Sequence, residues 1–106
     1  MPCVYALSSS NDPDKYRYVG ISRHDNPDKR LKNHLVSSKS LKYKYSYLPV
    51  YKWIRKEVSA GNQILATTLD TSSDWDQVCL LEIEYIKQFK DKNYNLLNMT
   101  KVERGY

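Results

Sequence analysis

The sequence predicts a small α/β domain whose elements follow the order strand, strand, helix, helix, strand, helix. Two short tyrosine-bearing segments near the N-terminus alternate as strands do, and three later segments repeat apolar residues at the spacing of amphipathic helices. The chain has 106 residues, enough for one modest hydrophobic core. No repeat, low-complexity tract or linker divides the sequence, so residues 1–106 are predicted to form a single domain.

The first two strands are predicted to pair as an antiparallel hairpin. Residues 3–7 and 16–21 have strand character, and the residues between them, 8–14, are rich in turn-forming Ser, Asn, Asp and Pro. Side chains alternate between the two faces of a strand. This alternation lets Tyr5 and Tyr18 point to the same side of the hairpin.

A helix is predicted to follow the hairpin. Asn26 can cap its first turn, and Pro27 suits the first helical position, where a backbone N–H would have no partner in the helix. Leu31 and Leu35 give this helix a side that faces the core.

The second helix is predicted over residues 49–60, and Gly61 is expected to end it. Residues 64–69 then form the third strand. Apolar residues of the second helix recur at helical spacing, and four are predicted to face the core: Val50, Trp53, Ile54 and Val58.

The third helix has an acidic residue at a core position. It is predicted to begin at residues 72–74 and to extend to about Phe89, before an extended segment over residues 94–99. Glu82 stands where the helical spacing requires an apolar residue, in a stripe formed by Trp75, Val78, Cys79, Tyr85, Ile86 and Phe89. A carboxylate there must be paired with a cation, protonated, or directed at a metal ion or a wet cleft, and the pattern leaves these alternatives open. Glu84 lies off the stripe and is predicted to be solvated.

Positive charge is concentrated in the middle of the chain. The net charge is +5 and the pI is near 9.2, which favours an anionic partner. We call residues 29–56 the basic segment, because they include nine Lys or Arg residues and no Asp or Glu. Over residues 42–47 cations alternate with tyrosines, which suits a phosphate backbone and exposed bases, although the tyrosines could instead cover the core. The residues predicted to contact nucleic acid are Lys39, Lys42, Tyr43, Lys44, Tyr45, Lys52 and Arg55.

Composition excludes several classes of protein. Cys3 and Cys79 are too few for a disulfide framework or a zinc site, and both are predicted to be reduced and buried. No stretch approaches the ~20 apolar residues of a membrane span, and no basic leader with an apolar run begins the sequence. The protein is therefore predicted to be cytoplasmic, with no membrane partner.

Four residues are candidates for chemistry, although each alone has a structural explanation. Arg30 and His34 are four residues apart and share a face of the first predicted helix. Arginine binds phosphate in a bidentate manner and histidine carries protons near neutral pH, but such a pair is most often a solvated helix surface. Tyr5 and Tyr18, taken singly, are typical packing residues.

The set as a whole resembles the GIY-YIG family of nucleases, and the resemblance covers nearly the whole chain. Residues 3–5 (Cys-Val-Tyr) and 18–20 (Tyr-Val-Gly) stand where that family has its two named triplets. An Arg on the first helix with a His one turn later, a Glu on a later helix and an Asn near the end complete the pattern. Residues 81–87 are similar to the family's metal-site helix, and residues 96–100 to its closing motif. The positions are held here by Tyr5, Tyr18, Gly20, Arg30, His34, Glu82 and Asn98.

The resemblance implies a three-stranded mixed or antiparallel sheet flanked by helices, and an endonuclease that hydrolyses DNA phosphodiester bonds at a single-metal site. Glu82 is then the ligand of Mg²⁺, for which Mn²⁺ can substitute. Two other readings stay open: a catalytically silent nucleic-acid-binding module of the same fold, and a nuclease subunit active only in a larger assembly. A protein-interaction domain would require the basic segment to be incidental.

The resemblance also assigns roles to the other site residues. Arg30 is expected to stabilise charge on the phosphate. Tyr5 is expected to act as the general base or to position the attacking water, with His34 relaying the proton and Tyr18 positioning the phosphate or a metal-bound water, although the division of roles among these three is open. Two residues are expected to support the site, Gly20 and Asn98. No residue distinguishes DNA from RNA by sensing a 2′-hydroxyl, and symmetric cutting of a duplex would need either dimerisation or sequential nicking.

Overall fold

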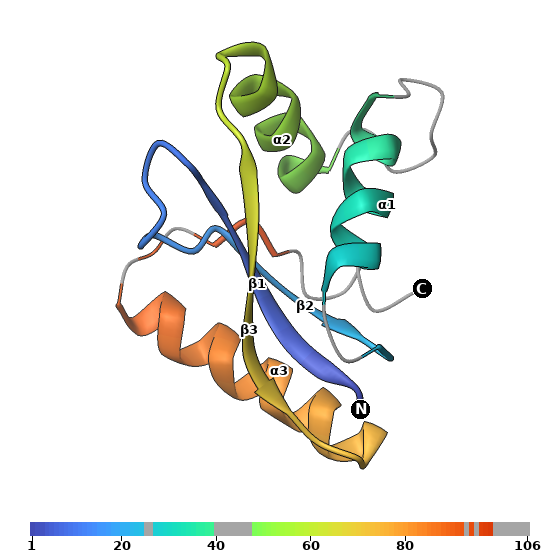
Figure 1. The fold of residues 1–106 in the computed structure, drawn as a ribbon. Helices are drawn as coiled ribbons and strands as arrows, with labels where there is room; N and C mark the ends of the chain where they lie inside the picture. Colours follow the sequence, from blue (N-terminus) through green and yellow to red (C-terminus); the bar gives the residue numbers. More distant parts are fainter. Residues whose placement is uncertain (25–26, 40–47, 93, 95, 99–106) are drawn as a thin grey trace.

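The computed structural model describes residues 1–24, 27–39, 48–92, 94 and 96–98. Its elements are, in chain order, β1 (Cys3–Ser9), β2 (Tyr18–Ser22), α1 (Asp28–Lys39), α2 (Pro49–Ser59), β3 (Ile64–Thr71) and α3 (Trp75–Asp91). This confirms the predicted α/β class and the predicted order of elements. Figure 1 shows α1 and α2 on one side of the sheet and α3 on the other, so that the sheet is a layer between helices.

The three strands form one antiparallel sheet in the order β2-β1-β3. The predicted hairpin is confirmed, although β2 begins at Tyr18, two residues later than expected. Within the hairpin Tyr5 pairs with Gly20, and Leu7 pairs with Tyr18. The pairing of β1 with β3 shifts register between Val4 and Tyr5, directly before a candidate site residue. All seven residues of β1 are buried, because helices cover both faces of this central strand.

The alternation of side chains along β1 and β2 divides the apolar residues between two cores. Tyr5 and Tyr18 lie on the same side of the sheet, as the alternation allowed. The first core, under α1 and α2, consists of Tyr5, Leu7, Tyr18, Leu48, Val50, Tyr51, Trp53, Ile54 and Ile64. The second core, under α3, consists of Val4, Val19, Ile21, Val78, Ile86 and Phe89.

The first two helices lie close to where the sequence predicts them, but α1 begins at Asp28, one residue after the predicted first position Pro27, and one core residue of α2 was predicted wrongly. Leu31 and Leu35 of α1 pack against the first core, as expected, and the predicted cap Asn26 lies outside the described residues. In α2 the prediction for Val58 is wrong, because this side chain is 45 % exposed. The buried residues of α2 all lie in its first half, so its last turn extends past the core. Gly61 follows the helix with φ of 86°, a conformation that favours glycine.

The third helix has the acidic core position that its sequence predicts. Asp74 caps α3 by accepting a hydrogen bond from the Asp76 backbone N–H at 3.0 Å. Glu82 is buried together with the apolar residues around it, whereas Glu84 is exposed, as predicted. Both cysteines are free thiols, but the expectation that both are buried is only half right, because Cys79 is half-buried. In the described part of the chain, no helix is long and apolar enough to cross a membrane.

Candidate active site

The site is organised around Tyr5, in the central strand. The Tyr5 side chain is fully buried on the α1 side of the sheet, and its hydroxyl lies 2.9 Å from Nε2 of His34. Burial raises the pKa of the Tyr5 phenol, and smaller effects of Tyr51 and then of the negative charge of Glu82 act in the same direction. The charge and hydrogen bonding of Arg30 act in the opposite direction without offsetting burial. Tyr5 is therefore a neutral phenol in this structure.

Gly20 makes room for the Tyr5 ring on the neighbouring strand. It pairs with Tyr5 in the sheet, and a Cβ at this position would lie 2.5 Å from both Cζ and the hydroxyl oxygen of Tyr5. The same Cβ would lie 3.0 Å from Cε2 of Tyr18. The need for glycine here is thus a steric one, imposed by the two tyrosines.

Replacing Gly20 with Ala is therefore expected to lower both stability and activity. The new methyl group must displace Tyr5 or the strand, which should cost about 1–3 kcal/mol in free energy of unfolding. Gly61→Ala is the matched control, because Gly61 has open space around it and its substitution strains only the backbone, at about 1–2 kcal/mol. Urea denaturation and a nuclease assay should show two destabilised variants, of which only Gly20→Ala loses activity per folded molecule. If the two variants have equal activity per folded molecule, the activity does not depend on a glycine at position 20.

α1 brings His34 and Arg30 to the same side of the sheet as Tyr5. The imidazole of His34 is buried among aromatic rings, with ring centroids 5.4 Å from Tyr18 and 5.8 Å from Tyr51. Burial, and then the positive charge of Arg30, lower the pKa of His34 to about 4. At neutral pH His34 is therefore uncharged and can accept a proton. The sequence prediction that Arg30 and His34 share a face of the helix agrees with these interactions.

Arg30 has a donor group that the fold leaves unused. Its Nε atom is buried and has no hydrogen-bond partner among the described residues. A buried N–H without a partner costs on the order of 1–3 kcal/mol. A phosphate oxygen would pair it, and the planar guanidinium suits such a ligand.

Asn98 closes the open edge of β2 beside the candidate site. Its side-chain Nδ2 donates to the Val19 carbonyl at 2.8 Å, and its Oδ1 accepts from the Val19 N–H at 2.9 Å. These two bonds replace the strand partner that β2 lacks on this side. Val19 stands between Tyr18 and Gly20, so Asn98 holds in place the strand that carries both.

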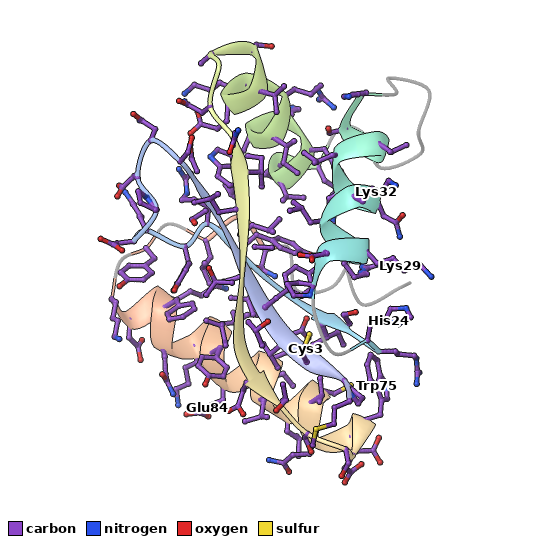
Figure 2. The ribbon with its side chains drawn as sticks, in the orientation of Figure 1. Cys3, His24, Lys29, Lys32, Trp75 and Glu84 are labelled. Atoms are coloured by element: carbon purple, nitrogen blue, oxygen red, sulfur yellow. The ribbon has the colours of Figure 1, made fainter. Side chains whose placement is uncertain are left out.

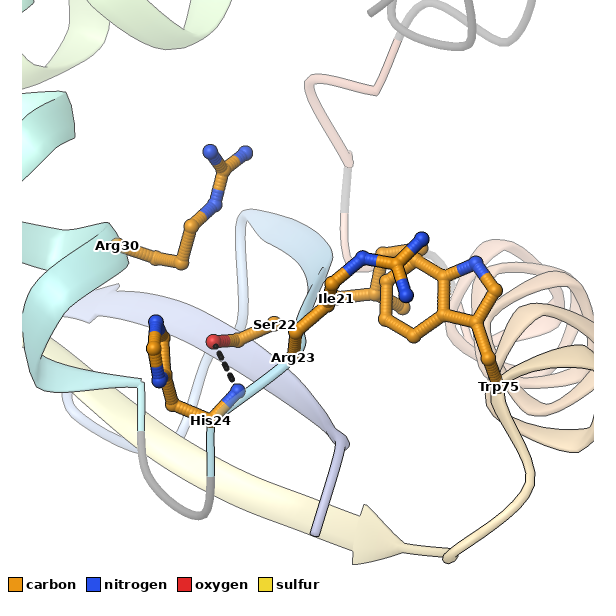
Figure 3. Close-up of a pocket in the computed structure, with 6 residues that line it drawn as sticks. All are labelled: Ile21, Ser22, Arg23, His24, Arg30 and Trp75. Carbon is orange, nitrogen blue, oxygen red and sulfur yellow. Dashed lines mark hydrogen bonds between the residues drawn. The ribbon is translucent and has the colours of Figure 1, made fainter.

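A cavity of about 490 Å³ adjoins the site and contains residues that the sequence analysis did not single out. It is lined by Ile21, Ser22, Arg23, His24, Arg30 and Trp75 (Figure 3). The sequence predicts Trp75 only as a member of the apolar stripe of the third helix, and it assigns no role to Arg23 or His24. The Cζ atom of Arg23 lies 3.9 Å from the centroid of the Trp75 ring. Only their positions in the sequence could have indicated that these residues lie near the site, because residues 21–24 directly follow the Tyr-Val-Gly triplet and Trp75 begins α3.

The structure describes part of the basic segment. Lys39 and Lys52 are exposed, while Arg55 is half-buried and donates from its guanidinium to the Ser38 carbonyl at 3.2 Å. Arg55 therefore links α2 to the end of α1. Lys29 and Lys32 lie on the outer side of α1 (Figure 2). Four predicted contact residues lie outside the described residues: Lys42, Tyr43, Lys44 and Tyr45.

Comparison with known proteins identifies the family. The chain matches the GIY-YIG catalytic domain over residues 1–95, nearly its whole length. Neither the curated proteins nor the solved structures gave a significant match. The antiparallel sheet flanked by helices and the order of its elements are consistent with this assignment. The chain therefore belongs to the family of the GIY-YIG catalytic domain, a family of nucleases that act on nucleic acid.

Proposed function

We propose that the protein is an endonuclease that hydrolyses phosphodiester bonds of DNA at a site holding one divalent metal ion, Mg²⁺. The observation that carries the proposal is the arrangement around Tyr5. Its hydroxyl contacts a neutral His34, the charges of Arg30 and Glu82 both act on it, and Arg30 has a buried donor left over. This arrangement provides a proton acceptor and an anion-binding group beside Tyr5, together with a carboxylate on α3 whose charge acts on the Tyr5 phenol.

The proposed proton path begins at the Tyr5 hydroxyl. In the tautomer with hydrogen on Nδ1, His34 accepts the hydrogen bond of the Tyr5 O–H through Nε2. As a water oxygen attacks phosphorus, Tyr5 takes a proton from that water and passes its own proton to Nε2. The new P–O bond forms while the bond to the leaving oxygen breaks, and the leaving oxygen takes a proton from solvent. Tyr5 need not rest as a phenolate, in keeping with its raised pKa.

Arg30 links substrate binding to this path. Its charge is the second cause, after burial, of the low pKa of His34. A phosphate bound to Arg30 offsets that charge, so the pKa of His34 should rise when DNA is bound. Arg30 also faces the negative charge that develops on the phosphate oxygens during attack.

Glu82 is the residue that would hold the metal ion. Among the described residues, no three His, Cys, Asp or Glu side chains gather closely enough to bind a metal by themselves. A single carboxylate fits Mg²⁺, which keeps several waters and commonly completes its shell with substrate phosphate oxygens. Mn²⁺ has the same preference for oxygen and is expected to substitute. When bound, the ion would neutralise phosphate charge and lower the pKa of bound water.

The proposal is tested by incubating the protein with supercoiled plasmid, single-stranded DNA and branched DNA, in Mg²⁺ and in EDTA. Cleavage that occurs in Mg²⁺ but not in EDTA supports the proposed function. Binding that weakens with salt, without cleavage, identifies a silent nucleic-acid-binding module or a subunit that needs a larger assembly. The absence of both binding and cleavage would favour a protein-interaction domain. Parallel RNA substrates decide between DNA and RNA, and the order in which nicked and linear plasmid appear distinguishes nicking from paired cutting.

The basic segment is expected to carry sequence-independent binding. Replacing Lys39, Lys42 and Lys44 together with Gln should weaken binding similarly across DNA sequences. It should also reduce the slope of log K against log salt by up to about three, because counterion release scales with the phosphates neutralised. Titrations in EDTA at several salt concentrations measure both quantities. A slope equal to that of the unsubstituted protein would show that the DNA does not contact these three lysines.

A further inference from the structure

The cavity beside the site has a second arginine on its wall. Arg23 and Arg30 both line it, and the described lining residues include no acidic side chain. Arg30 comes from α1, whereas Arg23 directly follows β2, so two separate parts of the chain direct a guanidinium to one space. In Figure 3 the two arginines occupy different sides of this space. The cavity is therefore electrostatically suited to an anion.

Trp75 holds the guanidinium of Arg23 in a defined place. The Cζ atom lies over the indole at 3.9 Å from the ring centroid, a distance typical of a strong cation–π contact. Stacking uses the flat face of the guanidinium, whereas its N–H donors lie in its plane and stay available at the edge. Arg23 is exposed, so these donors are accessible to a ligand. Because Arg23 covers this face of the indole, a nucleobase could stack there only by displacing it.

We propose that Arg23 binds a second phosphate group of the DNA strand whose scissile phosphate contacts Arg30, and that Trp75 positions Arg23 for this contact. The inference rests on the proposed nuclease function, which supplies the DNA strand. Two phosphates held from two walls would fix the direction of the strand through the cavity. Arg23 is thus a binding residue and Trp75 a positioning residue.

The test is DNA binding by Arg23→Gln, measured by fluorescence anisotropy with a labelled 20-base-pair duplex in EDTA, so that no cleavage occurs. Binding should weaken about tenfold, as for a lost charged contact, and the slope of log K against log salt should fall by about one. Lys90→Gln is the matched control. Lys90 is exposed in the last turn of α3, about 22 Å along the helix from Trp75, and its loss removes the same charge. This control should bind like the unsubstituted protein.

Two variants of Trp75 test its positioning role. Trp75→Leu should weaken binding about threefold without changing the salt slope, because Arg23 keeps its charge but loses its support. Trp75→Phe should restore most of the affinity, because it returns an aromatic face. Thermal melts in the same buffer check that each variant is folded.

Three results would overturn the inference. If Arg23→Gln equals Lys90→Gln in affinity and salt slope, Arg23 does not contact the DNA. A larger loss of affinity for Trp75→Leu than for Arg23→Gln would show that a nucleobase, and not Arg23, stacks on the indole. If Trp75→Phe binds DNA no more tightly than Trp75→Leu, Trp75 does not position Arg23. The proposed function fails separately, when the unsubstituted protein binds this duplex in EDTA but cuts no DNA in Mg²⁺.

Discussion

Arg30→Ala is expected to reduce DNA cleavage at least a hundredfold while weakening DNA binding only severalfold. The reason is that Arg30 offers a buried, unpaired donor next to Tyr5 and His34, where the charge of the attacked phosphate would develop. A single well-placed donor of this kind typically contributes 10²- to 10³-fold to the rate. Because the contribution arises in the transition state, it should appear in the single-turnover rate at saturating protein and not in the dissociation constant.

Two further variants distinguish this role from simple loss of charge. Lys29→Ala removes a positive charge from the neighbouring position of α1, where the side chain is exposed, and should cleave at a normal single-turnover rate. Arg30→Lys keeps the charge but not the planar fork, and should recover only part of the rate. Near-normal cleavage by Arg30→Ala would remove Arg30 from the chemistry.

The fold could be predicted well because its elements are encoded by local patterns. Alternation and turn residues predict the hairpin, and apolar residues at helical spacing predict α2. Glu82 was found in the same way, as a break in a helical stripe. The error at Val58 shows the limit of such patterns, because periodicity gives the face of a helix and not how far the core extends beneath it.

The site contacts could not be derived from the sequence, since they join residues far apart in the chain. Tyr5 meets His34 across 29 positions, and Val19 meets Asn98 across 79. The resemblance to the family implied that Tyr5, His34 and Asn98 belong to one site, but not that Asn98 pairs with a strand edge. The contact of Arg23 with Trp75 was missed for the same reason, because an exposed Arg after a strand has no local signal.

Glu82→Gln is expected to abolish metal-dependent cleavage, with a loss of at least a thousandfold, while DNA binding in EDTA is retained. Glu82 is only 6 % exposed, in the middle of the apolar face of α3, and its charge acts on Tyr5. A site kept for function commonly reduces stability, so the neutral, similarly shaped Gln should leave the melting temperature in metal-free buffer equal or higher. Mg²⁺ should raise the melting temperature of the unsubstituted protein, as a ligand of the folded state does, and this rise should vanish in Glu82→Gln.

Glu84→Gln is the matched control for this prediction, since it removes an exposed carboxylate two residues along the same helix. It should keep cleavage, and it should keep any stabilisation by Mg²⁺. Glu82 does have an interaction within the fold, so a structural role must be tested directly. A loss of several kcal/mol in metal-free buffer would identify Glu82 as half of a buried ion pair, because removing one partner leaves the other charge uncompensated. That result, with cleavage reduced only in proportion to the unfolded fraction, would defeat the metal assignment.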